Sequence, residues 1–236
     1  MALPTEEAYG ELQAAYDHFN RELFDDTLPP CLITFQREKR TYGYFARERF
    51  VSGNGDKTDE IAMNPAYFAV VPVMEVLQTL VHEMAHLWQF HFGTPGRRGY
   101  HNKEWAEKME GIGLMPSDTG KEGGRKVGEK MADYPIPGGA FMAAAEALLT
   151  TDFKITWRDR FPVKAQLEQV IAGEVEGVEL AELEALGVEI AAPEGAASKS
   201  NRRKYSCPKC EINAWGKPGL SLICGECQEP LADVGA

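Results

Sequence analysis

The chain of 236 residues lacks both an excess of basic residues and a long apolar run. Its 25 lysines and arginines face 36 acids, so the formal net charge of −11 argues against a protein coated with positive charge and wrapped in nucleic acid. The longest uncharged run, residues 61–74, has 14 residues and two prolines, whereas a membrane span needs about 20 apolar residues. The first ten residues have neither the basic nor the apolar segment of a secretory signal. We therefore expect a cytoplasmic protein with no membrane partner.

Cysteine is also scarce outside the last thirty residues, where Cys31 stands alone. Its apolar neighbours predict a core position for Cys31. The other four form two C-x-x-C pairs, Cys207 with Cys210 and Cys224 with Cys227, and 13 residues separate the pairs. In a reducing compartment this spacing is typical of a tetrahedral zinc site, whereas redox-active pairs need a βαβ context. A segment this short has little apolar surface, so the metal would supply its folding energy. The sequence predicts a zinc ribbon with one structural Zn²⁺.

The patterning of the rest of the chain predicts an α+β fold. Apolar spacings of three and four residues predict helices, and short apolar or aromatic runs between turn residues predict strands. The expected helices cover residues 5–24, 73–91, 102–109 and 140–149, and the expected strands cover residues 31–36, 42–50 and 59–64. Because the three strands follow one another closely, we expect them to form an antiparallel sheet.

Shifts in composition divide the chain into four parts. Residues 117–162 are at first rich in glycine, proline and lysine, and residues 168–194 contain eight acids and no base. Such acidic composition favours a spacer. The expected parts are a core over 1–116, an irregular and helical extension of the core over 117–162, an acidic linker over 163–200 and the ribbon over 201–236.

The residues that carry the chemistry lie on the long helix expected over 73–91, in the motif His82-Glu83-x-x-His86. Residues four apart share a helix face, so the two histidines can bind one metal ion. Glu83 lies one position further round the helix, where it can accept a proton from water that the metal activates. The uncharged flanking residues indicate that this helix is buried around the metal.

The third ligand decides the class of metal site. The metzincin continuation would require glycine and histidine where Gln89 and Phe92 stand, so that class is excluded. His91 lies about 140° round the helix from His86 and faces elsewhere. Two candidates remain open on spacing alone, His101 after a glycine-rich loop and Glu104 on the next helix.

Together these segments resemble the SprT/Spartan-like zinc metalloprotease family. The resemblance rests on the H-E-x-x-H motif, on residues 99–105 (Gly-Tyr-His-Asn-Lys-Glu-Trp), on shorter matches at 19–24, 28–29, 43–45 and 61–64, and on the cysteine pairs. It covers residues 5–116 and 203–231. It implies a zincin-like metalloprotease domain, with helices packed on a small antiparallel sheet, followed by a zinc ribbon. It also implies His101 as the third ligand of one catalytic Zn²⁺.

The activity implied by the resemblance is that of a zinc-dependent endopeptidase acting on DNA-bound or DNA-crosslinked proteins, with Glu83 as the catalytic base. Single-stranded or distorted DNA is then a partner beside the protein substrate, and association with the nucleoid follows. The candidate DNA contacts are basic and aromatic residues of the ribbon, which suit phosphates and unpaired bases: Arg202, Arg203, Lys204, Tyr205 and Trp215. Two alternatives stay open, a zinc peptidase with a dedicated protein substrate and no DNA control, and a non-catalytic zinc-binding adaptor.

Overall fold

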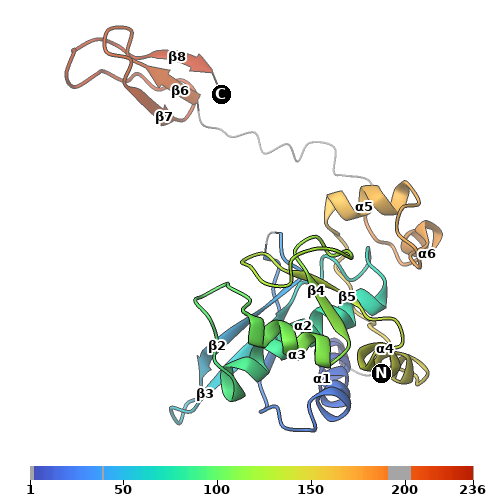
Figure 1. The fold of residues 1–236 in the computed structure, drawn as a ribbon. Helices are drawn as coiled ribbons and strands as arrows, with labels where there is room; N and C mark the ends of the chain where they lie inside the picture. Colours follow the sequence, from blue (N-terminus) through green and yellow to red (C-terminus); the bar gives the residue numbers. More distant parts are fainter. Residues whose placement is uncertain (1–2, 39, 191–202, 236) are drawn as a thin grey trace. The chain divides into compact units, whose positions relative to one another are not determined.

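The computed structural model of the chain describes residues 3–38, 40–190 and 203–235 (Figure 1). The chain divides into two compact units, Met1–Ile190 (unit 1) and Ala191–Ala236 (unit 2). Each unit has secondary structure of its own. The candidate DNA contact Arg202 and the last part of the expected acidic linker, residues 191–200, lie outside the described residues.

The helices and strands of unit 1 match most of those expected from the sequence. In chain order they are α1 (Pro4–Leu23), β1 (Leu32–Phe35), β2 (Gly43–Val51), β3 (Lys57–Met63), α2 (Val73–Phe92), α3 (Lys103–Gly111), β4 (Leu114–Ser117), β5 (Ala132–Pro135), α4 (Ala140–Leu149), α5 (Lys164–Ile171) and α6 (Leu180–Ala185). Within the described part of the chain, no helix combines the length and apolar character that a membrane crossing requires.

The three-stranded sheet of unit 1 is mixed, which corrects the expectation of an antiparallel sheet. The strand order is β1-β3-β2. β3 pairs antiparallel with β2, but it pairs parallel with β1, with Leu32 opposite Glu60 and Phe35 opposite Met63. The cause is topological: β2 carries the chain back, so β3 runs in the same direction as β1 and inserts between the two earlier strands. β2 is left as an edge strand.

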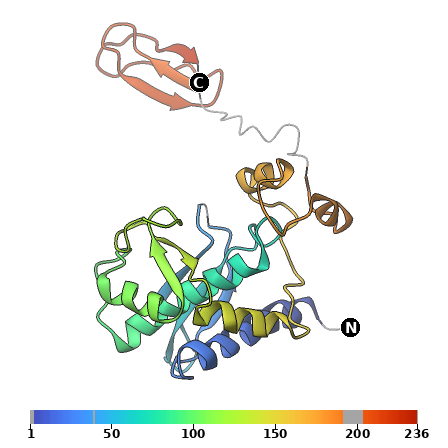
Figure 2. The same cartoon turned by 45° about the vertical axis from the view of Figure 1, so that its right-hand side comes forward.

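Helix α2 passes through the centre of unit 1 and organises its core (Figures 1 and 2). It buries a wide apolar surface that includes Leu77, Leu80, Val81, Met84 and Leu87. Helix α1 buries the face predicted from its apolar spacing: Leu12, Tyr16, Phe19 and Leu23. α1 lies beside α4 (Figure 2), where the rings of Phe19 and Phe141 stack at 5.9 Å. The long central helix is therefore held on several sides by apolar contacts.

The acidic segment contains regular structure as far as residue 190. Although the sequence predicts a linker over 163–200, residues 163–190 lie in unit 1 and form α5 and α6. Leu167 and Val170 of α5 and Leu183 of α6 are buried together with Ala69 and Val70. Burial of these few apolar side chains stabilises the packing of the segment onto the rest of unit 1, despite its many acids.

Unit 2 is a small three-stranded antiparallel sheet. Its strands β6 (Arg203–Ser206), β7 (Asn213–Gly216) and β8 (Ala232–Gly235) are arranged in the order β7-β6-β8. Tyr205 is its largest buried side chain, and its hydroxyl donates to Lys217 O at 2.6 Å and accepts from Leu220 N at 3.1 Å. The two loops that follow β6 and β7 carry the four cysteines.

A glycine at the start of β2 allows the sheet to approach α2 closely. A Cβ at Gly43 would lie 2.8 Å from Ala62 O and 3.0 Å from Thr79 Cγ2.

We expect Gly43→Ala to destabilise unit 1 by about 1–3 kcal/mol, the usual effect of overpacking, as measured by urea unfolding. The control is Gly10→Ala in α1, where a Cβ meets nothing within 4 Å, and where alanine should stabilise the helix by about 0.5–1 kcal/mol. Equal midpoints for Gly43→Ala and the wild type would contradict the close approach.

Candidate metal centre and its surroundings

Three histidine side chains from two elements converge in unit 1. His82 and His86 lie on successive turns of α2, and His101 lies just before α3. Their candidate ligand nitrogens all lie within 4.8 Å of one another, and His86 Nε2 lies 3.1 Å from His101 Nε2. Two nitrogens bound to one tetrahedral zinc ion are about 3.3 Å apart, given Zn–N distances of about 2.0–2.1 Å. The three histidines thus form a potential metal site compatible with zinc.

The position of His101 is fixed by its own backbone. His101 N donates to Gly128 O at 2.8 Å, and Gly128 N donates to His101 O at 3.1 Å. The next residue, Asn102, caps α3 by accepting from Trp105 N at 3.1 Å, as its side chain predicts. The loop from the end of α2 is therefore tied at both the bridge and the cap, and it holds His101 against α2.

Buried partners orient two of the three rings. Asp133 of β5 places Oδ2 2.8 Å from His82 Nδ1, and Gly128 O lies 3.2 Å from His101 Nδ1. Each contact occupies Nδ1 and leaves Nε2 for the metal, which is the usual outer arrangement of a metal-bound histidine. Trp105 is fully buried, and its ring lies 4.5–5.2 Å from those of all three histidines. The centre is therefore backed by a rigid aromatic surface.

The buried carboxylate of Asp133 has one oxygen without a partner in the described part of the chain, which favours a cation at this centre. Its side chain is buried, and Oδ1 has no hydrogen-bond partner among the residues that the structure describes. A buried carboxylate is costly unless positive charge compensates it. A divalent cation on the three imidazoles would provide that charge. Sequence reasoning missed Asp133, because it stands alone in a stretch without periodicity and no spacing links it to His82.

Burial and mutual repulsion keep two of the imidazoles available as ligands. Burial, with the neighbouring His82, lowers the pKa of His86 well below its usual value, and the same two causes lower the pKa of His101 to about 4. Burial acts in the same direction on His82, but the hydrogen bond with Asp133 and the charges of Glu83 and Asp133 outweigh it and raise the pKa of His82. At neutral pH His86 and His101 are thus unprotonated, as metal binding requires.

Glu83 lies beside this centre and not among the three converging ligands. Its side chain is buried, and burial together with the charge of Asp133 raises its pKa to about 7, although His82 and the backbone of Phe45 oppose the shift. It also touches the sheet, because a Cβ at Gly43 would lie 3.5 Å from Glu83 Cγ. A carboxyl group with this pKa can accept and return a proton near neutral pH.

The alternative third ligand, Glu104, has a different role. Its Oε2 accepts from Gln89 Nε2 at 2.9 Å and from Thr94 N at 2.6 Å, so it fixes the start of the loop after α2. His91 also lies away from the centre, with Nε2 2.7 Å from Asp59 Oδ2.

The four cysteines of unit 2 come together as a second potential metal site. Their sulfur atoms all lie within 4.8 Å of one another, and none forms a disulfide. The two pairs turn in the same way: Glu211 N donates to Cys207 O, Gln228 N donates to Cys224 O, and both donors have positive φ. Backbone amides of Cys210 and Lys209 lower the pKa of Cys207 to about 7, which favours the thiolate. The cluster fits a zinc ribbon.

The candidate DNA contacts of the ribbon differ in their accessibility. Tyr205 is only 2% exposed, so the expectation that its ring offers a face to a base is wrong: the ring fills the interior of the small sheet. Trp215 is 62% exposed and lies opposite Lys204 in the β6–β7 register. Arg203 pairs with Asp233 at 3.1 Å. Of the four described candidates, Lys204 and Trp215 thus form an accessible pair on one face of the sheet.

Comparison with known proteins places this centre in a family. The model of the SprT-like family matches residues 12–122, which include His82, Glu83, His86 and His101. An uncharacterised protein in the mucB 3′ region of Salmonella typhimurium is 63% identical to this chain over 60 residues, which are 25% of this chain and 81% of that protein. No solved structure matches the chain.

The contact between Asp133 and His82 predicts the effect of removing the carboxylate. We expect Asp133→Ala to weaken zinc binding at the histidine site by about 10–100-fold, because His82 loses the group that orients its ring. Asp133→Asn, which keeps an acceptor oxygen, should lose less. Competition titration with a chromophoric zinc chelator measures both, and Asp152→Ala, an exposed acid elsewhere in unit 1, is the control. Unchanged affinity in Asp133→Ala would contradict the role.

Proposed function

This chain belongs to the SprT-like family, and on that premise we propose that unit 1 is a zinc-dependent endopeptidase that hydrolyses peptide bonds in protein substrates. The observation that carries the proposal is the buried carboxyl of Glu83 beside three converging imidazoles. His82, His86 and His101 would hold the ion, and Asp133 and Gly128 orient two of the three rings.

The chemistry divides between the ion and the side chains. A zinc ion bound there would act as a Lewis acid and would lower the pKa of a water ligand to about 7. Glu83 would take the proton from the attacking water and deliver it to the leaving amine, because its carboxyl lies beside the three imidazoles without being one of the ligands. Trp105 closes the centre on one side of the imidazoles, so water and substrate would have to approach from another side.

Glu83 favours this function over that of a non-catalytic adaptor. A purely structural zinc site gains nothing from a buried carboxyl group outside its ligand set, and burying such a group costs free energy. In unit 2 the four cysteines complete a ligand set by themselves, as a structural site does.

Replacement of Glu83 tests the peptidase directly. We expect Glu83→Gln to bind zinc as the wild type does and to cleave an unstructured protein substrate about 10²–10⁴-fold more slowly, because the amide cannot accept the proton. Cleavage is followed by gel electrophoresis and mass spectrometry, and metal content by atomic emission. Glu107→Gln, an exposed acid on α3, is the charge-matched control. Wild-type rates in Glu83→Gln would disprove the mechanism.

We further propose that the substrates are proteins bound or crosslinked to DNA, and that the ribbon contacts single-stranded or distorted DNA. This places the protein in the cytoplasm with access to the nucleoid. The support is local: Trp215 offers a flat exposed face, and Lys204 beside it offers positive charge for a phosphate. The alternative of a dedicated protein substrate without DNA control differs in requiring no such face.

Removal of the exposed ring separates these two alternatives. Loss of one stacked base costs about 1–3 kcal/mol, so we expect Trp215→Ala to bind a single-stranded oligonucleotide about 5–150-fold more weakly by fluorescence anisotropy. Ile223→Ala removes another exposed apolar side chain of unit 2 and serves as the control. DNA that neither binds the wild type at low salt nor changes its protease activity would exclude DNA control.

A further inference from the structure

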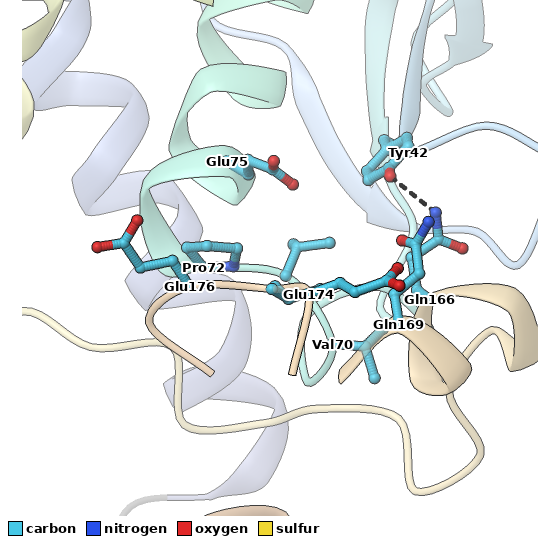
Figure 3. Close-up of a pocket in the computed structure, with 10 residues that line it drawn as sticks. Tyr42, Val70, Pro72, Glu75, Gln166, Gln169, Glu174 and Glu176 are labelled. Atoms are coloured by element: carbon cyan, nitrogen blue, oxygen red, sulfur yellow. Dashed lines mark hydrogen bonds between the residues drawn. The ribbon is translucent and has the colours of Figure 1, made fainter. Parts of the chain in front are cut away.

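A cavity of about 320 Å³ lies in unit 1 between the start of α2 and the segment that contains α5 (Figure 3). Tyr42, Glu75 and residues 70–72 form one wall, and Gln166, Gln169 and residues 174–176 form the other. The second wall lies beyond residues 12–122, the part that matches the SprT-like family. One wall of the cavity is therefore built by a segment that the family match does not include.

Direct contacts hold the second wall in place. Leu167 and Val170 of α5 are buried against Ala69 and Val70. Gln166 Nε2 donates to Tyr42 Oη at 3.1 Å, as Figure 3 shows, and the Tyr42 ring stacks on that of Tyr67 at 4.0 Å. The helix that carries part of the second wall is thus packed against the rest of unit 1.

The lining is negative and has no basic side chain. Its three acids are Glu75, Glu174 and Glu176, and none of them has a salt-bridge partner within 4.0 Å among residues 3–38, 40–190 and 203–235. In Figure 3 the carboxylates of Glu75 and Glu174 point toward the side of Tyr42 and Gln166, whereas Glu176 points away. Desolvation by the surrounding protein raises the pKa of Glu75, so a positive ligand would stabilise its charged form.

The cavity lies within reach of the proposed catalytic centre. Tyr42 precedes Gly43, which packs against Glu83. Glu75 and Glu83 lie on the same helix, eight residues or about 12 Å apart along its axis. An extended peptide covers that distance with three or four residues.

We propose that this cavity binds a lysine or arginine side chain of the protein substrate, three or four residues from the bond that is cut. The carboxylates of Glu75 and Glu174 accept from the cationic head, the glutamine side-chain oxygens and Tyr42 Oη accept its remaining hydrogen bonds, and the aliphatic stem lies against the part-exposed Pro72 and Val175. The volume suits a side chain of this length and far exceeds the size of a bare metal ion. The proposal rests on the peptidase function of unit 1.

The test uses unstructured 12-residue peptides that contain one lysine and no other charged side chain. The lysine is moved through every position, and in the counterpart of each peptide glutamine replaces it. The full-length, zinc-loaded protein is incubated with each, and mass spectrometry locates the cuts. We expect the wild type to cut at a constant three or four residues from the lysine, with kcat/KM about tenfold above that for the counterpart. In the double variant Glu75→Gln/Glu174→Gln, kcat/KM for the lysine peptides should fall about tenfold, to the value for the counterpart. This factor corresponds to about 1.4 kcal/mol from charged hydrogen bonds.

The control for lost charge is Glu168→Gln/Glu179→Gln, which changes two exposed acids of the same segment outside the cavity lining. It should keep the preference for lysine. Equal cleavage of lysine and glutamine peptides by the wild type would overturn the proposal while leaving the peptidase intact.

If the wild type cuts no peptide, the peptidase proposal fails. The binding of a lysine peptide then tests the cavity by itself. Anisotropy of a labelled lysine peptide on Glu83→Gln measures that binding. Binding that weakens about tenfold on further loss of Glu75 and Glu174 would support the site, and binding that is absent or unaffected would refute it.

Discussion

Unit 1 depends on the burial of ionisable side chains within its central helix. α2 carries His82, Glu83 and His86 among apolar residues that have almost no exposed surface. A buried polar or charged group is costly without a partner. The surrounding structure provides those partners, because the loop after α2 brings His101, the bridge at Gly128 fixes that loop, and β5 brings Asp133 to His82. One cation on the imidazoles would complete the arrangement and offset the charge of Asp133.

The two units use different sources of stability. Unit 1 has a large apolar core formed by α1, α2, α3 and α4 with the sheet, so its metal centre can be specialised for chemistry. Among its described residues 203–235, unit 2 buries little beyond Tyr205 and two cysteines, so the four thiolates and a metal ion would provide much of its folding free energy. Zinc can therefore be catalytic in unit 1 and structural in unit 2. The ligands differ accordingly, with three imidazoles in unit 1 and four thiolates in unit 2.

Features with a local signal in the sequence could be predicted. The helix ends of α2 and α4, the cap at Asn102, the two cysteine pairs and the H-E-x-x-H face depend on neighbouring residues, and the structure has all of them. Features that arise from distant pairing could not be predicted. The parallel pairing of β1 with β3 follows from where β3 inserts, and Asp133 reaches His82 across 51 residues. In the acidic segment, the number of glutamates hid the few apolar positions that dock α5.

In the proposed arrangement, three imidazoles of unit 1 bind the catalytic zinc and four thiolates of unit 2 bind a second ion. Zinc-edge X-ray absorption on the full chain measures both sites together. We expect two zinc ions per chain, with an average shell of about two sulfur atoms at about 2.3 Å and about two nitrogen or oxygen atoms at about 2.0–2.1 Å. A single zinc ion per chain with four sulfur ligands would contradict it, because the histidine centre would then hold no metal.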